Sequence, residues 1–276
     1  MLLKSRRTPI TRDNGGFIAR PNMPGWMLRR PVDHGHGPLA MVVESILHPG
    51  RLIAMHEHRN DEIISWVPDG VMRHEDSVGG RLVIDAGHLM VMNAGQSIWH
   101  SEETHPTDPH LRMLQILVRP RAADLEPLIQ FKAIHAAPPN TWRHLVGPEG
   151  GPAPFFVRSA LDFHDIRLDA GASGEFPAMA GRDLYFYVFS GAIAAGGKRF
   201  AEAEQGLLTG GGRLAFTARA PTVMVAFLID PAADVARQGT VGDMAEIPPP
   251  RIVPALRALS ALGLLRLAMG LRRRGG

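Results

Sequence analysis

The sequence predicts an all-β protein built from two consecutive β-rich units. Short apolar or alternating segments recur along most of the chain, and turn residues separate them at short, regular intervals. The 276 residues include 30 glycines and 23 prolines, a content that suits many short strands joined by turns. This spacing favours a sandwich or a barrel over alternating strands and helices, and the length allows one large or two medium domains.

The first unit is expected to hold seven strands, which are bounded by turns rich in Gly, Pro, Asn and Asp. The expected strands are Leu39–Ile46, Leu52–His58, Glu62–Val67, Val71–Ser77, Arg81–Asp85, His88–Met92 and Met113–Arg119. After them comes Pro120–Arg143, where a short helix is expected at Ala122–Gln130 and Pro138-Pro139 follows. We therefore place a domain boundary in this segment, with an N-terminal domain at 1–135.

The second unit repeats the same kind of pattern. Its expected strands are Phe155–Ala160, Ile166–Asp169, Leu184–Phe189, Lys198–Ala201, Arg213–Ala218 and Val223–Ile229. We assign it to residues 136–246. The remaining residues, 247–276, form a basic tail in which Val253–Leu271 is rich in Leu and Ala and is expected to be helical.

The two units can be interpreted as copies of one another. The segment that starts at Glu62 and ends at Gly70 has the same length and apolar profile as the segment from Asp183 to Gly191, 121 residues further on. The same offset carries His56 and His58 to Pro177 and Met179. Neither of these can replace an imidazole ligand, so only the first unit is expected to hold a metal.

The most informative pattern in the chain is His56-Glu57-His58 followed by His100-Ser101-Glu102. Residues i and i+2 of a strand point to the same face, so two neighbouring strands would aim three imidazoles and one carboxylate at one point. That set suits a divalent first-row metal, with iron(II) as the first choice if open coordination positions remain. A closed structural zinc site fits less well, because such sites favour Cys and the chain has none.

Several neighbouring residues are expected to have other roles. Glu57 and Glu103 have the opposite strand parity from the ligands and should face outward. Glu62 shares the parity of His56 and His58, so it competes with Glu102 as the carboxylate ligand. The family resemblance described below implies that Glu102 is the ligand, and we therefore place Glu62 behind the ligands, where a carboxylate orients a ligand histidine. His74 is interpreted as a structural residue or as part of the rim of a pocket.

The same residues resemble a known family. Pro49-Gly50, followed by His56-x-His58-x-x-x-Glu62 and Gly70, resembles the first cupin motif. The stretch Met92–Glu102, which ends in His-x-Glu, resembles the pirin version of the second motif. His74-Glu75-Asp76-Ser77 is also similar to pirins, and the resemblance covers about residues 45 to 120.

Two departures from the family pattern stand out. Glu57 lies where pirins usually carry Pro between the first two histidines. Asn60-Asp61 replaces the Gly-Phe of the eukaryotic pirins and is nearer the bacterial branch.

The resemblance implies a bicupin, with two cupin-type β-barrels in one chain and one metal site. His56, His58, His100 and Glu102 would bind the metal, with Fe(II) first and Mn, Ni, Co, Cu or Zn as alternatives. Some bacterial pirins cleave flavonols, which implies an oxygen-dependent dioxygenase of the quercetin 2,3-dioxygenase type. Its partners would be a small aromatic substrate and dioxygen, and Glu102 would also be the catalytic base on the flavonol 3-hydroxyl.

Two other functions stay open at this point. Pirins also include non-enzymatic, iron-binding, redox-sensing regulators that bind a protein partner. A metal-dependent isomerase or a small-molecule binder on the same barrel is a third hypothesis, because fold does not fix function.

Charge and hydropathy indicate which partners and which cellular location are expected. The net charge is +3, but residues 251–276 contain six Arg and no acid, which leaves 24 basic against 27 acidic residues in the body. The body is therefore not expected to bind nucleic acid. No secretory signal is recognisable, and Arg266 interrupts an apolar run too short to span a membrane, so we expect a soluble cytoplasmic protein with a packed or disordered tail.

Overall fold

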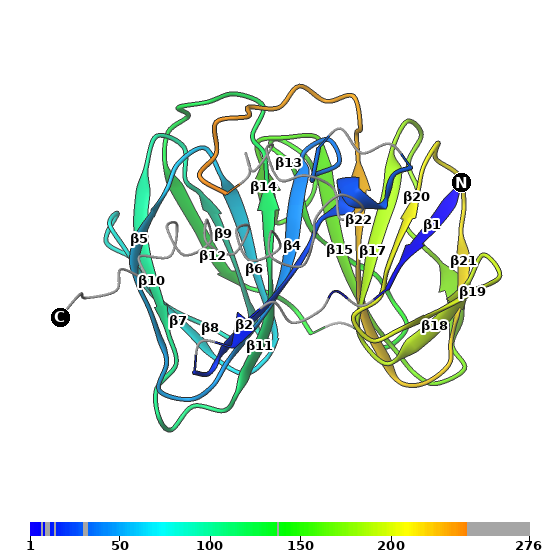
Figure 1. Ribbon diagram of the computed structural model, residues 1–276, viewed down its shortest axis with the longest axis horizontal. Coiled ribbons are helices and arrows are strands. Elements are labelled where there is room, and N and C mark those ends of the chain that lie inside the picture. Colours follow the sequence, from blue (N-terminus) through cyan, green and yellow to red (C-terminus); the bar gives the residue numbers. More distant parts are fainter. Residues whose placement is uncertain (7, 9–11, 14, 30–32, 137, 242–276) are drawn as a thin grey trace.

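The computed structural model describes residues 1–6, 8, 12–13, 15–29, 33–136 and 138–241 of the chain (Figure 1). Strands dominate these residues, and their one helical element is the 3-10 helix η1 (Pro24–Met27). The all-β prediction is therefore confirmed. The expected helix at Val253–Leu271 and the tail at 247–276 lie outside the described residues.

The N-terminal half contains one seven-stranded and one four-stranded sheet, both fully antiparallel. The larger sheet consists, in spatial order, of β12 (Leu128–Ala133), β9 (His88–Asn93), β6 (Glu62–Asp69), β11 (Leu111–Val118), β4 (Leu39–Leu47), β3 (Phe17–Asn22) and β2 (Arg12–Asp13). The smaller sheet consists of β5 (Leu52–His58), β10 (Ile98–Glu103), β7 (Met72–Asp76) and β8 (Arg81–Ile84).

The C-terminal half is also made of a seven-stranded and a four-stranded sheet. The larger sheet consists, in spatial order, of β1 (Leu2–Ser5), β20 (Gln205–Leu208), β17 (Asp183–Ser190), β22 (Thr222–Ile229), β15 (Leu161–Leu168), β13 (Arg143–Pro148) and β14 (Phe155–Val157). The smaller sheet consists of β16 (Ser173–Glu175), β21 (Ala215–Ala218), β18 (Ala192–Ala195) and β19 (Lys198–Ala201). We expected barrels; among the described residues, the hydrogen-bonded ladders of each half form two separate sheets.

The strand orders of the two halves correspond in the four-stranded sheets and in the central strands of the seven-stranded sheets. In the four-stranded sheets, β5-β10-β7-β8 matches β16-β21-β18-β19. In the seven-stranded sheets, β6 and β17 both occupy the third place, and these are the two segments that lie 121 residues apart in the sequence. The correspondence supports our interpretation that the halves are copies, while the boundary between residues 135 and 136 stays a prediction.

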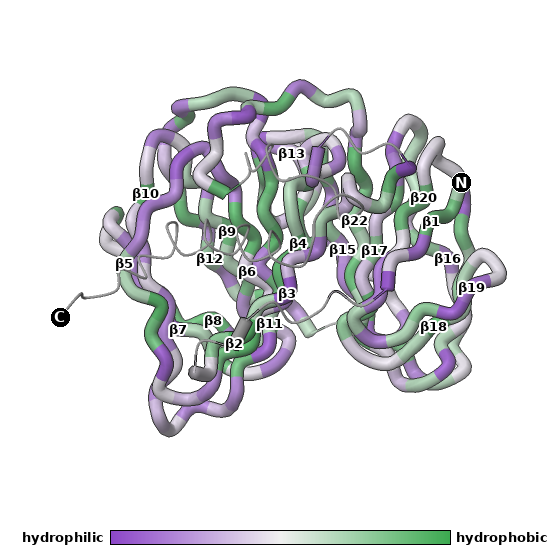
Figure 2. Tube along the Cα trace, in the orientation of Figure 1, coloured by the Kyte–Doolittle hydropathy of each residue, from purple (hydrophilic) through white to green (hydrophobic). Residues whose placement is uncertain are grey.

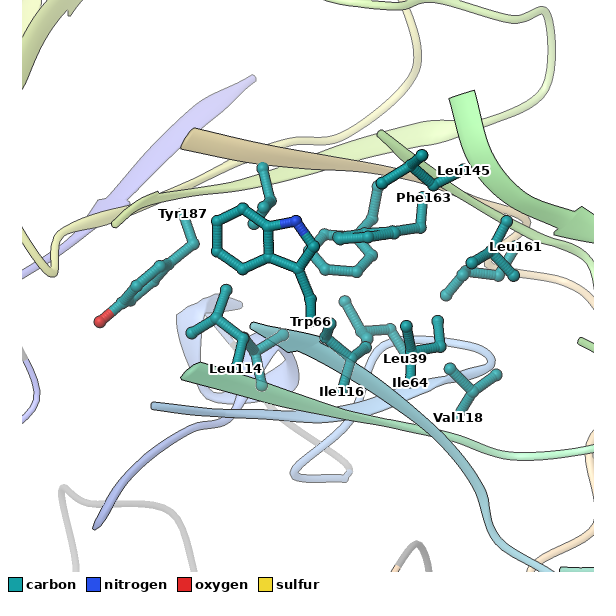
Figure 3. Packing of buried hydrophobic residues seen from close by; sticks show 14 of the residues in the cluster. Leu39, Ile64, Trp66, Leu114, Ile116, Val118, Leu145, Leu161, Phe163 and Tyr187 are labelled. Atoms are coloured by element: carbon teal, nitrogen blue, oxygen red, sulfur yellow. The ribbon is translucent and has the colours of Figure 1, made fainter. Parts of the chain in front are cut away.

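A shared hydrophobic core joins the two seven-stranded sheets (Figure 3). Trp66 lies at its centre, where its ring meets those of Phe163 and Phe189 edge-on, with centroids 6.5 and 5.2 Å away. Its indole N–H donates a hydrogen bond of 3.0 Å to Asp165 Oδ2 in the other half. Figure 2 shows that the central strands of both sheets are largely hydrophobic. Complete burial of one apolar side chain, such as that of Phe163 in this core, stabilises the fold by roughly 1.5–3 kcal/mol.

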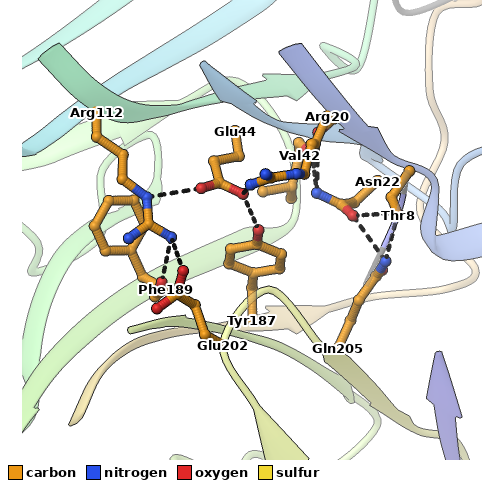
Figure 4. Close-up of polar contacts among 10 residues, drawn as sticks. All are labelled: Thr8, Arg20, Asn22, Val42, Glu44, Arg112, Tyr187, Phe189, Glu202 and Gln205. Carbon is orange, nitrogen blue, oxygen red and sulfur yellow. Dashed lines mark hydrogen bonds and ion pairs between the residues drawn. The ribbon is translucent and has the colours of Figure 1, made fainter. Parts of the chain in front are cut away.

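A buried ionic cluster also connects the halves (Figure 4). Glu44, on β4, accepts hydrogen bonds from Arg20 at 2.8 Å, from Arg112 at 2.7 Å and from the Tyr187 hydroxyl of the other half at 2.6 Å. Arg112 also donates to the backbone oxygen of Phe189. Because the carboxylate is completely shielded from water, its partners must be present together for the cluster to be stable.

Segments from each end of the described chain cross to the opposite half. β1 comes from the N-terminus but pairs with β20 in the C-terminal half. After β22 the chain returns to the N-terminal half, where Ala236 donates its N–H to Pro120 O and Thr240 donates to Arg59 O (Figure 1). The two halves are therefore linked by their termini as well as by their core.

The helix expected at Ala122–Gln130 is wrong. Residues 121–124 form bends, and β12 begins at Leu128 and pairs with β9. The unpaired edge of β9 offers six cross-strand partners to this segment, so tertiary pairing outweighs its local helical preference.

In the C-terminal half, two histidine rings stack at a partly exposed position. His164, on β15, lies parallel to His144, on β13, with ring centroids 4.4 Å apart. Burial and the neighbouring His144 lower the pKa of His164 to about 4. The folded chain therefore keeps this imidazole neutral under conditions in which an unfolded chain would protonate it.

This lowered pKa makes His164 a source of acid sensitivity. Its stabilising contribution is complete above pH 6.5, the ordinary histidine value, and is lost as the pH falls through 6.5 toward 4, because the unfolded state then binds the extra proton. In His164→Gln, the fall in the free energy of unfolding between pH 7 and pH 4 should shrink, by at most about 3 kcal/mol. Urea denaturation at both pH values measures this, with His135→Gln as the exposed control. An undiminished fall in His164→Gln would contradict the assignment.

Candidate metal centre

The expected pairing of the two histidine-bearing strands is present. β5 and β10 are antiparallel neighbours in the four-stranded sheet, with His100 opposite His56 and Ile98 opposite His58. Alternation along the strands turns the three imidazoles to the interior face, where each is at most 6% exposed.

Three of the four predicted ligands come together at one point. The ligand nitrogens of His56, His58 and His100 lie within 4.8 Å of one another. The ring centroid of His100 is 4.3 Å from that of His56 and 5.1 Å from that of His58. Such a spacing leaves room for one cation between the rings.

The fourth predicted ligand, Glu102, lies beside this group rather than in it. A register shift separates His100 from Glu102, and the Glu102 carboxylate belongs to a second group with His74 and His100, again within 4.8 Å. The Gln115 amide donates to its two oxygens at 2.7 and 2.8 Å. His100 is common to both groups, so the two sets of donors are adjacent.

Outer partners fix the rings of the two histidines on β5. His56 Nδ1 lies 2.9 Å from Ala54 O, and His58 Nδ1 lies 3.1 Å from Asp61 Oδ2. Both partners accept hydrogen bonds, so each Nδ1 carries the proton and each Nε2 keeps a free lone pair. Metal-binding histidines are usually held in this way.

The ring of His100 is held by His74, which is in turn held by Asp76. His74 Nε2 donates to Asp76 Oδ2 at 3.1 Å, which leaves His74 Nδ1 to accept from His100 Nδ1 at 3.3 Å. His100 Nε2 is buried and has no hydrogen-bond partner among the described residues. A buried nitrogen without a partner is costly, and a metal ion would satisfy it, so the donor set fits a divalent metal.

Burial sets the protonation states in this region. It lowers the pKa of His56 to about 4, with a further contribution from His58, and it lowers the pKa of His100 well below the ordinary value. Neutral imidazole is the form that binds metals. Burial also raises the pKa of Glu102 to about 7, which would allow this carboxyl group to exchange a proton near neutral pH.

The role expected for Glu62 is wrong. Its carboxylate accepts from Asn93 at 2.9 Å and from the backbone N–H of Arg158 at 2.6 Å, on the seven-stranded sheet. Asn60 has a positive φ of 53°, so the chain turns between β5 and β6 and the strand parity counted from His58 does not continue to Glu62. Asp61 holds His58 instead.

Two residues contact the candidate ligands although the sequence did not predict it. His74 was expected to be structural or part of a pocket rim, and Gln115 was not predicted to have a role. His74 is only 3% exposed and contacts His100 directly. The His74-x-Asp76 alternation carried a usable signal, because both side chains share one face of β7. Gln115 comes from β11 of the larger sheet, and nothing local in the sequence indicates its contact with Glu102.

The corresponding strands of the C-terminal half hold no such histidines. There the facing residues on β16 and β21 are Gly174 and Phe216. A Cβ atom on Gly174 would lie 3.0 Å from the Phe216 ring, which packs with Phe176 and Trp142. Both groups of metal-capable side chains among the described residues therefore belong to the N-terminal half.

Two similar double-sheet halves, with inward-facing histidines in the first, define an all-β protein of the cupin class. A family model described as Pirin matches residues 32–118. Residues 32–118 of this chain are therefore similar to the pirin family.

Two curated relatives match parts of the chain. A candidate quercetin 2,3-dioxygenase of Pseudomonas aeruginosa is 32% identical over 155 residues, which are 55% of this chain and 66% of that relative. The quercetin 2,3-dioxygenase of Escherichia coli K12 is 28% identical over 102 residues, 37% of this chain and 44% of the relative. The chain thus spans less than two thirds of the length of these relatives.

Solved structures share the fold over a longer stretch. YhhW from Escherichia coli superimposes with a TM-score of 0.74 at 17% identity, covering 83% of this chain and 97% of YhhW. The complex of the bacterial pirin YhhW with nickel(II) gives a TM-score of 0.71 at 18% identity, covering 83% of this chain and 99% of that chain.

Among the described residues, no helix is long and apolar enough to cross a membrane.

The two overlapping donor groups can be separated by substitution. If the first group binds the ion, His56→Ala should lose nickel(II) binding, whereas His74→Phe should keep one ion per chain with an affinity about 10–100-fold lower. Isothermal titration of the metal-free protein measures both, with the exposed His105→Ala as control and circular dichroism to verify folding. The reverse pattern would assign the ion to His74, His100 and Glu102.

Proposed function

We propose that the protein is a metal-dependent dioxygenase that acts on a flavonol or a similar aromatic compound. The observation that carries the proposal is the convergence of three buried imidazoles whose outer nitrogens are held by other groups. The names of the relatives support the reaction class, since two of them are called quercetin 2,3-dioxygenase or a candidate for it.

The ligands in this proposal are His56, His58, His100 and Glu102. Fe(II) is the first choice of metal, and Mn, Ni, Co, Cu or Zn would also accept three imidazoles and a carboxylate. The nickel(II) complex of YhhW supports a divalent ion as the metal. Glu102 shares His100 with the group of three imidazoles, so its carboxylate lies next to the proposed ion site.

Glu102 is also the proposed base. Burial raises the pKa of its carboxyl group to about 7, a value suited to removing a proton from the 3-hydroxyl of a flavonol at neutral pH. Gln115 donates to both oxygens and holds the carboxylate in place. A bound metal would supply positive charge that stabilises the resulting oxyanion.

A second candidate function is a metal-bearing regulator that binds a protein partner. The outer face of the four-stranded sheet favours it, because Leu52, Met55 and Val83 are 63, 43 and 45% exposed there. Together with charged side chains such as Arg73 and Glu75, they line a hollow of about 580 Å³. Exposed apolar patches of this kind often mark interaction surfaces.

Oxygen consumption tests the enzymatic proposal. The Fe(II)-loaded protein should consume oxygen with quercetin, and Glu102→Gln should lower kcat/KM by about 10²–10⁴-fold as its base is removed. The matched control is Glu103→Gln, which changes the neighbouring carboxylate on the opposite face of β10 and should retain activity. Metal content is measured on each sample.

Two results would contradict this proposal. Full oxygen uptake by metal-containing Glu102→Gln would exclude the base role. Absence of uptake by wild-type protein loaded in turn with Fe, Mn, Ni, Co and Cu would exclude a dioxygenase for these substrates and favour the regulator.

A further inference from the structure

The C-terminal end of the described chain lies against the turn that follows β5. Thr240 donates its N–H to Arg59 O at 3.0 Å, and its hydroxyl accepts from the N–H of Arg59 at 2.9 Å. Val241 is 6% exposed and packs in the same core cluster as Ile63 and Met92. Residues 238–241 are separated from β5 by about 180 positions in the sequence, and they lie outside the region that the family model matches.

Asp61 is the residue at which this segment meets the candidate metal centre. Its side chain is fully buried, and Oδ2 accepts from the Thr240 hydroxyl at 2.6 Å, from the Val241 N–H at 3.0 Å and from His58 Nδ1 at 3.1 Å. A hydroxyl carries one hydrogen, and two acceptors lie within reach of that of Thr240: Asp61 Oδ2 at 2.6 Å and Arg59 O at 3.2 Å. The carboxylate is the nearer and charged acceptor, so we direct the hydrogen to Asp61. The three donors together fix the carboxylate.

The local backbone makes this approach close. Asn60 has a φ of 53° and is held by Gly95 O and by the N–H of Asp124, so that the turn directs Asp61 back toward His58. A Cβ atom on Gly239 would lie 2.3 Å from Asp61 Oδ1. Only glycine therefore lets the C-terminal segment lie this close to Asp61.

We propose that Thr240 is a positioning residue for the metal centre. Together with the Val241 N–H, it fixes the Asp61 carboxylate, which holds the His58 ring with its proton on Nδ1 and its Nε2 toward His56 and His100. The C-terminal segment thereby supports a proposed ligand, His58, that lies on β5 in the N-terminal half. This inference rests on the proposed function only in taking His58 as a metal ligand.

The proposal predicts an effect on metal affinity and on the His58 tautomer. Partners behind a ligand histidine typically change metal affinity by 10–100-fold. In the full chain, Thr240→Val should weaken nickel(II) binding tenfold or more, whereas Thr240→Ser, which keeps the hydroxyl, should stay within about twofold. Titration calorimetry measures the affinity. The matched control is Thr217→Val, which removes a hydroxyl hydrogen bond in the C-terminal half.

The second readout uses the metal-free protein. The ¹⁵N signals of His58 should show the Nδ1–H form in the wild type and in Thr240→Ser, and a mixture of both tautomers in Thr240→Val. A purely structural role would lower thermal stability without moving these signals. If Thr240→Val does not fold, Gly239→Ala displaces the same segment and should produce the same mixture.

Unchanged His58 signals together with unchanged nickel(II) affinity in Thr240→Val would overturn the inference. Failure of the wild type to bind any divalent metal would overturn the proposed function. The tautomer in the metal-free protein would still decide whether Thr240 and Asp61 hold the ring, so the two failures are distinguishable.

Discussion

The apolar contact between the two seven-stranded sheets is the constraint on which the rest of the structure depends. Ile64 and Trp66 turn toward the other half, so alternation along β6 turns Ile63 and Ser65 to the opposite side, into the N-terminal half. A slip of one residue would exchange these faces and place Ser65, instead of Trp66, in the contact between the halves. The orientation of the whole N-terminal half, and with it the side on which histidines can gather, follows from this one buried surface.

The candidate metal centre is accordingly not a local structure. Its histidines come from the adjacent strands β5 and β10, but the groups around them come from elsewhere. His74, which contacts His100, lies on β7. The residue that holds Glu102 lies on β11, and the residue that donates to Asp61 lies on the returning C-terminal segment. The contacts of Glu44 and of β1 likewise cross between the halves. The family resemblance covers the proposed ligands and Asp61, whereas Thr240 and Val241, which donate to Asp61, lie outside that region.

The sequence alone was sufficient where the information is local. The apolar run that follows Pro49-Gly50 located β5 in full, and the i, i+2 spacing brought His56 and His58 to one face. The sequence was not sufficient where pairing between distant segments decides the structure. The turn at Asn60 interrupts the strand alternation, so the prediction for Glu62 was wrong. Residues 128–130 were predicted to be helical because their pairing with β9 is not evident from the local sequence. His74 was given too small a role, because its burial depends on the pairing of β7 with β10.

The Gly174–Phe216 pair gives the C-terminal half a different character. At the place where the other half brings charged or coordinating groups together, this half has closely fitted aromatic rings, and even one additional carbon on Gly174 would crowd them. Restoring histidines there would require new volume as well as new donor atoms. A change in the opposite direction would therefore require several substitutions together, because the aromatic rings occupy the space that donor atoms would need.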